Sequence, residues 1–429
     1  MTEPPDSQNV ALIKASDKDV NPVKFSESIT NQNVLDFGNV NALVVRVTND
    51  NKYWIIGLSN GTIVLLPTED SGDNKNNFYT LHADNEVLPC ADLQPVPYSN
   101  EHSQTNRHLL LAAYVSGHAR LWHYTGATKS SRLLATFTEE RITNPSDIQP
   151  RINAEKPMNQ ILACSCSYDA KRFITGGDDC HLRVYDLKSR TRLRVCSSSF
   201  SKDKMDGHVR RICAVKYHPR GAIYEDYVHI FITGGWDDTI QIWDDRYLHS
   251  LWIYHGPHIC GSDALEIESE SNHILSTSWR RDKAILQVWK FNEELMVEFY
   301  GCTELQGDEL SIQPGAEIVN SQTGAAHYCQ PVAEIAQDGY DRPSKGYVAK
   351  WLGPYYIGFG GSGANILKII SRLTLNVVGS VSELTNGVYS LACIQPNGND
   401  NANSGGVKRI IQFAFASGTR VYIAQYEQK

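Results

Sequence analysis

Three residues near the middle of the chain are of the types that act as nucleophile, base and orienting acid in hydrolytic enzymes. Thr233 offers a hydroxyl, His208 an imidazole and Asp237 a carboxylate. A hydroxyl that gives its proton to an imidazole, which a carboxylate orients in turn, can attack an acyl carbon. This chemistry needs a hydroxyl that is open to substrate, so it depends on which elements hold the three residues.

Cysteine and histidine could instead hold a metal ion. The chain has 10 cysteines, spread without a dense spacing pattern. Cys164 and Cys166 alternate along a predicted strand and form no CxxC motif, whereas a structural zinc site needs about four clustered ligands. His255, His258 and Cys260 resemble a cluster in the sequence, but we interpret them as a loop that joins two structural units. We therefore expect no metal and no other cofactor.

Composition and motifs argue against several further classes of function. The net charge of -8 and the pI near 6.0 disfavour nucleic acid as a partner. No apolar run approaches the roughly 18 residues of a membrane span, and the polar start MTEPPDSQ is unlike a signal peptide. GxSxG, HExxH, P-loop and dinucleotide motifs are all absent from the sequence, so we expect no enzyme. We expect a soluble protein of the cytoplasm, the nucleus or both.

The chain repeats a short unit of strand-like segments. The clearest copy spans residues 206–246 and contains DGHVRRICAVKYHP and HIFITGGWDDTIQIWDDR, with a further strand-like run, LHSLWIY, after it. Weaker copies follow at intervals of about fifty residues in both directions, which gives seven copies. Hydrophobic residues make up 41% of the chain, so these strands can bury a large core.

The GH near the start of the unit and the WD near its end resemble the WD40 family, and the resemblance covers nearly the whole chain from about residue 22. It implies an all-β fold, a single seven-bladed β-propeller whose blades are four-stranded antiparallel sheets. The copy at residues 205–254 matches strongly, the copies that begin near residues 157 and 258 match moderately, and the others match only in their strand pattern.

By that resemblance, His208, Thr233, Asp237 and Trp243 form a structural tetrad of hydrogen bonds in blade four. Asp237 accepts from the imidazole, whose other nitrogen meets the Thr233 hydroxyl, and this hydroxyl accepts from the indole N–H. A threonine held in this way inside a sheet is not open to substrate. The hydrolytic interpretation is therefore rejected, and no catalytic residue is assigned.

The tetrad is incomplete in the neighbouring blades. Blade three has Pro157 in the place of the histidine and Tyr185 in the place of the tryptophan, whereas blade five keeps His258 and Trp289. We expect these departures to leave the remaining blades dependent on packing alone.

The ends of the chain and one long insertion decide how the ring closes. The seventh copy supplies three strands before Lys429, which would leave an open sheet edge. We predict that NPVKFSESI, residues 21–29, completes that blade, as the resemblance implies. The propeller would then occupy residues 21–429 after a mobile tail at residues 1–20. A long insertion at residues 302–345, between blades five and six, would either contact a partner or cover the side of the ring.

Propellers of this family usually bind partners on the rim that carries the loops before the first strand and between the second and third strands. Tryptophan and arginine are enriched among binding hot spots because each combines a large contact area with a polar group. The alternative for Trp236 is that it packs on its own blade. The positions that the resemblance selects are Asp178, Arg210, Trp236, Trp279, Arg280 and Arg281.

A second motif lies at the opposite face. Residues 243–246, Trp243, Asp244, Asp245 and Arg246, spell WDxR, which resembles the element by which many WD40 substrate receptors dock on the adaptor of cullin-RING ubiquitin ligases. A long guanidinium fork at this position could enter a carboxylate-lined groove on a partner. WD ends many blades, however, and an arginine two residues later also occurs by chance.

The sequence therefore predicts a non-catalytic scaffold or adaptor that binds other proteins or peptides through the rims of a propeller, as a subunit of a larger complex. A substrate receptor of a cullin-RING ligase is the alternative. Neither membrane nor nucleic acid is expected as a partner.

Overall fold

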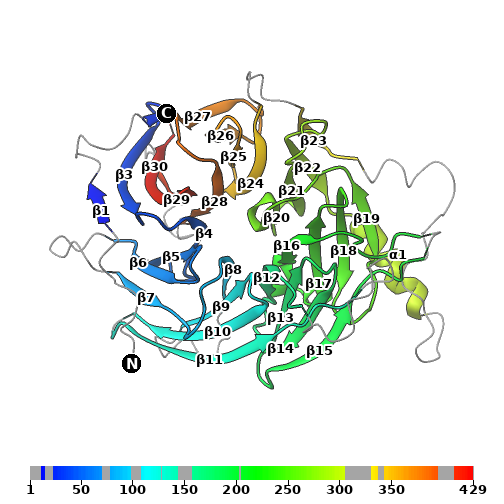
Figure 1. Cartoon of the computed structure of the whole chain (residues 1–429). Helices are drawn as coiled ribbons and strands as arrows, with labels where there is room; N and C mark the ends of the chain where they lie inside the picture. The colour runs from blue at the N-terminus through cyan, green and yellow to red at the C-terminus, as the bar shows by residue number, and fades with distance from the viewer. Residues whose placement is uncertain are drawn as a thin grey trace.

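The computed structural model describes residues 11–14, 23–69, 78–97, 108–126, 128–143, 157–201, 204–304, 330–336, 343–394 and 410–428. Within these residues the strands form seven antiparallel sheets, which stand radially around a common centre (Figure 1). The predicted seven-bladed β-propeller is confirmed. No described helix is long and apolar enough to cross a membrane.

Blades one to four follow the chain in order, each as a four-stranded meander that runs from an inner to an outer strand. Blade one has β4 Ala42–Val47, β5 Tyr53–Leu58, β6 Ile63–Pro67 and β7 Tyr79–Leu81, and blade two has β8 Cys90–Pro95, β9 His108–Tyr114, β10 His118–Thr125 and β11 Ser130–Thr138. Blade three has β12 Ile161–Cys166, β13 Arg172–Gly177, β14 Leu182–Asp186 and β15 Thr191–Cys196. Blade four has β16 Ile212–Tyr217, β17 Ile230–Gly235, β18 Thr239–Asp244 and β19 Trp252–His255.

Blades five to seven complete the ring. Their strands are β20 Leu265–Ile267, β21 His273–Thr277, β22 Leu286–Lys290 and β23 Ala333–Ile335; β24 Lys345–Leu352, β25 Tyr356–Ser362, β26 Leu367–Ser371 and β27 Val377–Ser382; and β28 Val388–Cys393, β29 Ile410–Ser417 and β30 Arg420–Glu427. One helix, α1 Glu293–Glu304, follows β22.

The core is divided into seven hydrophobic clusters, one between each pair of neighbouring blades. The middle strands are therefore buried on both faces, as the fully buried β17 and β18 show. Because these strands carry near-continuous runs of Ile, Val, Phe and Trp rather than strict alternation, they suit a sheet that is covered on both sides. Each blade thus needs both neighbours to bury its faces.

The ring is closed by an N-terminal strand, but by a later one than the sequence indicated. β3 (Ile29–Asp36) pairs with β30 and packs Leu35 against Val45 and Trp54 of blade one. Residues 24 and 25 form β2 (Lys24–Phe25), which extends the edge of blade six by pairing with β27. The prediction that residues 21–29 form the closing strand is therefore wrong, because β3 at residues 29–36 closes the ring. The eight-residue strand at 29–36 buries Ile29, Val34 and Leu35.

The predicted mobile tail also contains a paired segment. Strand β1 (Ala11–Lys14) lies antiparallel to β3 and becomes the outermost strand of blade seven. This is a correction for residues 11–14. Residues 1–10 and 15–22 lie outside the described residues.

The long insertion lies inside blade five and not after it. Within residues 302–345, β23 pairs with β22 as the fourth strand of that blade, and Lys345 already begins blade six. A run of three residues, Ala-Glu-Ile, carries too little pattern to be recognised as a strand. The segment 305–329 lies outside the described residues.

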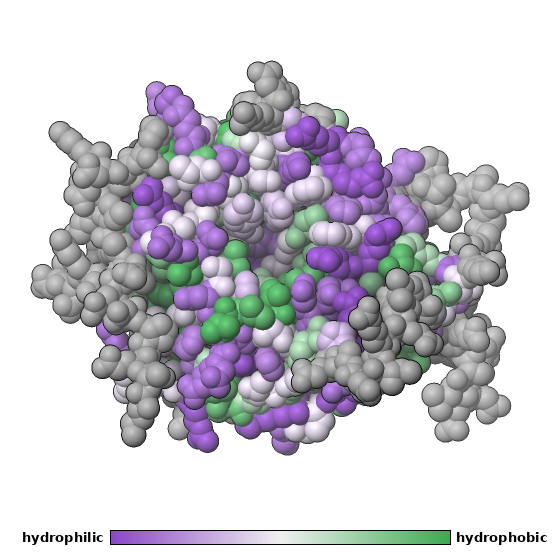
Figure 2. Space-filling view, in the orientation of Figure 1, coloured by the Kyte–Doolittle hydropathy of each residue, from purple (hydrophilic) through white to green (hydrophobic). Residues whose placement is uncertain are grey.

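The surface of the ring is chemically mixed. On the face in view, hydrophobic residues lie in small groups separated by hydrophilic ones (Figure 2).

Candidate functional site

The four tetrad residues of blade four form one chain of hydrogen bonds. His208 Nδ1 donates to Asp237, with N–O distances of 2.9 and 3.1 Å, and the Thr233 hydroxyl donates to His208 Nε2 at 2.7 Å. The indole of Trp243 donates to the same Thr233 oxygen at 2.8 Å. Each group has one complementary role, so the Asp237 carboxylate at one end fixes the imidazole tautomer.

This chain of bonds positions the turn between β17 and β18. Asp237 also accepts from the backbone N–H of Val209 at 3.1 Å and from the Thr239 hydroxyl at 2.8 Å. Burial alone would raise the pKa of Asp237, but His208 and these donors outweigh it and hold the pKa below its usual value. Asp238 follows in the left-handed region at φ +60°, which Asp tolerates better than most residues. The exposed Trp236 is therefore presented by a rigid turn.

The same bonds remove the chemistry that the residue types suggested. The Thr233 side chain is fully buried, and its hydroxyl donates to His208 while it accepts from Trp243. A hydroxyl in this position cannot meet a substrate. Thr233, His208 and Asp237 are thus structural groups.

Blade three replaces the tetrad by a carboxylate-centred network. Glu139 accepts from the Thr175 hydroxyl, from Asn159 Nδ2 at 2.7 Å and from the Tyr185 hydroxyl at 2.9 Å. Arg183 lies 3.4 Å from the same carboxylate, and all these groups are buried. Burial raises the pKa of Glu139, although Arg183 and the three donors act in the opposite direction.

Glu139, and not Pro157, therefore stands where the histidine of a complete tetrad would stand. The expectation that the incomplete blades depend on packing alone is wrong for blade three. It is also wrong for blade five, where Trp289 donates to the Ser276 hydroxyl at 2.9 Å. His258 leaves this blade and contacts Asp238 of blade four at 2.7 Å. Short polar links of this kind follow no fixed spacing, so the sequence alone did not indicate them.

Half of the predicted rim residues meet around one cavity of about 330 Å³. Arg210, Trp236 and Arg280 line it together with Asp237, Asp238 and His258. Blade four supplies Arg210 from the loop before β16 and Trp236 from the turn after β17, and Arg280 comes from the turn after β21 in blade five. The rim prediction therefore joins two blades at one place.

Aromatic and cationic side chains are paired at this cavity. Trp236 is 38% exposed, with the Arg211 guanidinium 4.2 Å from its ring centre and the His258 ring 5.7 Å away. Trp279 lies 6.3 Å from the other side of His258, beneath the Lys345 ammonium at 4.0 Å. The cation–π contact with Arg211 and the tilted contact with His258 hold Trp236 in place but leave over a third of its surface open.

The predicted rim residues other than the tryptophans differ in whether their side chains already bind other groups of the protein. Arg280 pairs with Asp238 at 3.1 Å and with Asp282 at 2.6 Å. Asp178 belongs to blade three, where it accepts from Arg141 and from a backbone N–H, and it lies away from the cavity. Arg281 is exposed but does not line the cavity. Arg210 is exposed, and no ion pair or hydrogen bond of its side chain is found within the described part of the chain.

The WDxR arginine does not project freely from the opposite face. Arg246 Nη2 lies 2.6 Å from the buried Asp244, Arg246 Nε lies 3.0 Å from the same carboxylate, and Nη2 meets the Tyr300 hydroxyl at 3.3 Å. Tyr300 of α1 donates in turn to Asp244 at 2.5 Å. Burial alone would raise the pKa of Asp244, but Arg246 and Tyr300 hold it below its usual value. The motif therefore anchors helix α1.

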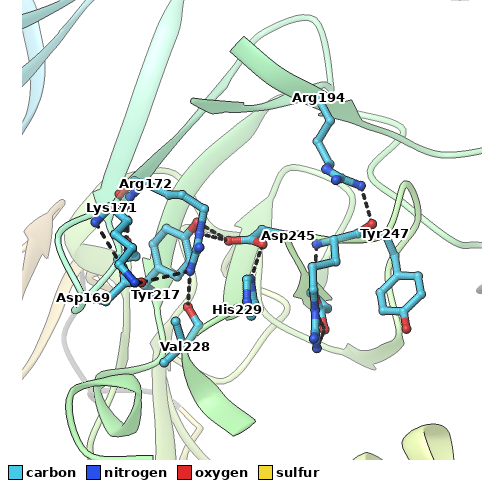
Figure 3. A network of polar contacts seen from close by, with 12 residues as sticks. Asp169, Lys171, Arg172, Arg194, Tyr217, Val228, His229, Asp245 and Tyr247 are labelled. Atoms are coloured by element: carbon cyan, nitrogen blue, oxygen red, sulfur yellow. Dashed lines mark hydrogen bonds and ion pairs between the residues drawn. The ribbon is translucent and has the colours of Figure 1, made fainter. Parts of the chain in front are cut away.

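The second aspartate of the motif ties blade four to blade three (Figure 3). Asp245 accepts from Arg172 at 2.8 Å, from the Tyr217 hydroxyl at 2.7 Å and from His229 at 2.6 Å. His229, Asp244 and Asp245 have ligand atoms within 4.8 Å of one another, as a metal site would need. Both carboxylates already accept bonds from Arg172, Tyr217, Arg246 and Tyr300, so the donor set fits an internal network better than a cation.

The other metal candidates are also placed by the structure. His255 ends β19, and His258 and Cys260 lie in the segment before β20, as expected for a loop that joins two blades. Cys164 and Cys166 are buried in β12. Burial raises the pKa of Cys260 to about 12 and that of Cys166 well above its usual value, which keeps both thiols protonated.

A buried arginine in the central channel was missed in the sequence. Arg46 of β4 binds Asp92 of β8 at 2.6 Å and Asp263, which precedes β20, at 2.9 Å. It also donates to Ser262 at 3.1 Å and to Ser390 of β28 at 3.2 Å. Burial alone would lower the pKa of Arg46, but Asp263 and Asp92 raise it above its ordinary value. We call Arg46, Asp92 and Asp263 the channel hub.

Comparisons with known proteins agree with this architecture. The sequence profile of the family described as WD domain, G-beta repeat, matches residues 155–186 and 196–244, which include the first three strands of blades three and four. A stretch of 115 residues, 27% of this chain, is 22% identical to human (Homo sapiens) Coronin-7. The match covers 10% of that protein.

Proposed function

Because this chain is a seven-bladed β-propeller of the WD40-repeat family, we propose that it is a non-catalytic interaction scaffold whose partner-binding surface is the rim of blades four and five. The observation that carries the proposal is the cavity between Arg210, Trp236 and Arg280. It combines a partly exposed indole with a guanidinium that makes no ion pair or hydrogen bond to the described residues, and tryptophan and arginine are enriched among measured binding hot spots.

Rigidity supports the same surface. The tetrad fixes the turn that carries Trp236, and Arg211 and His258 hold its indole. A partner that docks here would therefore lose little conformational entropy on the side of the propeller. Asp237 and Asp238 already bind His208 and Arg280. The Arg210 guanidinium, which has no ion pair among the described residues, therefore favours a protein segment with a carboxylate at this point.

The proposal is tested by affinity capture and mass spectrometry with the full chain and the variants Trp236→Ala and Arg210→Ala. Each is expected to reduce recovery of the specific partners about tenfold or more, while the melting temperature changes by only a few degrees. Tyr355→Ala and Arg192→Ala, at exposed positions of blades six and three, are the matched controls and should recover partners as the wild type does. Equal recovery by all five proteins would contradict the assignment. A fall in melting temperature without loss of partners would indicate that Trp236 only packs on its blade.

A ligase-receptor role lacks comparable support. Docking through the WDxR motif would have to separate Arg246 from Asp244 and Tyr300, and this would leave the buried Asp244 carboxylate without its main partner. We therefore propose the rim of blades four and five, and not Arg246, as the primary contact. Residence in a larger complex of the cytoplasm or the nucleus is part of the same proposal.

A further inference from the structure

A second cavity, of about 230 Å³, lies at the centre of the ring at the ends of the inner strands. The inner strands β4, β8, β12, β16, β20, β24 and β28 surround this centre (Figure 1), and each contributes at least one lining residue. Because Lys216 and Tyr217 end β16, this mouth opens on the face opposite the Arg210–Trp236 rim. It is therefore separate from the proposed partner site.

Among the described residues, each charged side chain at the channel mouth except one forms an ion pair. The channel hub pairs Arg46 with Asp92 and Asp263, and the Lys350 ammonium is shared between Asp263 at 3.4 Å and Glu266 at 3.5 Å. Glu266 also accepts from a backbone N–H at 2.6 Å. All three carboxylates thus have cationic or hydrogen-bonded partners.

Lys216 is the exception. It lines the cavity, yet no carboxylate within the described residues lies at ion-pair distance from its ammonium. Burial lowers the pKa of Lys216, and Lys350 and Arg46 act in the same direction against Asp92 and Asp263. A partly buried charge without an ion pair, as found for Lys216 within the described residues, raises the free energy of the folded state.

Two further donors face the same cavity from blade three. The Ser165 side chain is 4% exposed, and its oxygen accepts from the Tyr217 N–H at 2.9 Å, so its own O–H remains without an acceptor in the described structure. Tyr168 also lines the cavity, and its phenolic hydroxyl is protonated at neutral pH and can donate. Ser165, Tyr168 and Lys216 therefore offer donors from neighbouring blades. The one carboxylate among the described lining residues is that of Glu266, which Lys350 neutralises at 3.5 Å.

We propose that the channel mouth binds a small oxyanion, held by the Lys216 ammonium and the hydroxyls of Ser165 and Tyr168. The ligand places a negative charge beside the Lys216 ammonium, and its oxygen atoms accept from the O–H groups of Ser165 and Tyr168. The cavity volume of about 230 Å³ suits an inorganic phosphate or a small carboxylate. Arg46 also lines the cavity, but its guanidinium is already bonded to Asp92 and Asp263. Both sources share this oxyanion chemistry.

The experiment titrates the full chain with inorganic phosphate, and separately with acetate, at constant ionic strength with chloride as the reference salt. Binding is followed by calorimetry and by the melting temperature, which rises with a ligand that binds only the folded state. Lys216→Met should weaken binding of the better anion about tenfold or more, and Ser165→Ala should weaken it by less. Lys188→Met, an exposed lysine in a turn of blade three, is the matched control and should bind as the wild type does.

The melting temperature without added anion distinguishes an anion-binding role of Lys216 from a merely structural one. Since Lys216→Met removes an unpaired charge, its melting temperature without phosphate or acetate should equal or exceed that of the wild type. The proposal is overturned if neither anion binds the wild type at millimolar concentration, or if Lys216→Met and the wild type bind equally. Partner capture through Trp236 should be unchanged in Lys216→Met, so failure of this proposal leaves the rim assignment intact.

Discussion

At the scale of residues, networks of buried hydrogen bonds link the strands of blades three and four. In blade four the sequence predicted this in full, because His208, Thr233, Asp237 and Trp243 all keep the residue types of the tetrad. In blade three the equivalent acceptor is Glu139, which belongs to the preceding segment of the chain. Since a carboxylate can replace an imidazole as acceptor, a search for the original residue types could not find it.

Thr233→Val tests the energetic role of the tetrad. The change keeps the shape of the side chain but leaves the indole N–H of Trp243 and one ring nitrogen of His208 without a partner, which should lower the free energy of unfolding by about 1–3 kcal/mol. Chemical denaturation measures this directly. Thr80→Val, at an exposed position of β7, is the control and should change stability by less than about 0.5 kcal/mol. If the two variants are equally stable, the tetrad contributes nothing to stability.

At the scale of elements, secondary structure was easier to predict than its place in the ring. The middle strands are recognisable because their β-branched and aromatic runs are flanked by Gly- and Asp-bearing turns, as in IFITGGWDDTIQIWDD. β23 was missed because a three-residue strand at the edge of its sheet needs few apolar residues. The closing strand was misplaced because the segment just before β3 also has a strand-like sequence. Helix α1 was not predicted, and its position depends on the contact of Tyr300 with Asp244 and Arg246.

Tyr300→Phe should loosen α1 from the ring. The substitution keeps the aromatic ring beside Arg246 but removes the hydroxyl that donates to Asp244, at a cost of about 1 kcal/mol. Hydrogen exchange should quicken in residues 293–304 and stay unchanged in β17 and β18. Val297→Ala, at a 74% exposed position of the same helix, should leave exchange close to that of the wild type. Unchanged protection of α1 in Tyr300→Phe would show that other contacts hold the helix.

At the scale of the whole molecule, the repeat period was sufficient to predict the ring, whereas contacts across its centre were not predictable. Arg46 and Asp263 are separated by 217 positions in the chain. Only closure of all the blades brings them within 2.9 Å. A single arginine in a strand-like run carries no signal of such a partner. The channel hub and the cavity beside it therefore belong to the part of the fold that sequence reasoning could not reach.

Removal of the N-terminal strands tests closure. A chain without residues 1–36 lacks β3, which buries Ile29, Val34 and Leu35, and should lose roughly 5 kcal/mol of stability and aggregate through the open edge of β30. A chain without residues 1–22 keeps β3 and should lose far less. Thermal unfolding and light scattering measure both effects. Similar melting temperatures for the two truncated chains would exclude β3 as the strand that closes the ring.

The channel hub has a consequence for how the molecule folds. In an open array of repeats each repeat contacts only its neighbours. A destabilising substitution therefore has a local effect, and unfolding can begin at either end. Here one guanidinium is bonded to groups from blades two, five and seven. The partners of Arg46 can come together only after nearly all the blades have formed. Contacts between residues so far apart in the sequence make folding slow. The propeller should therefore unfold in a single cooperative transition, and a destabilising substitution in one blade should also destabilise the blades across the central axis.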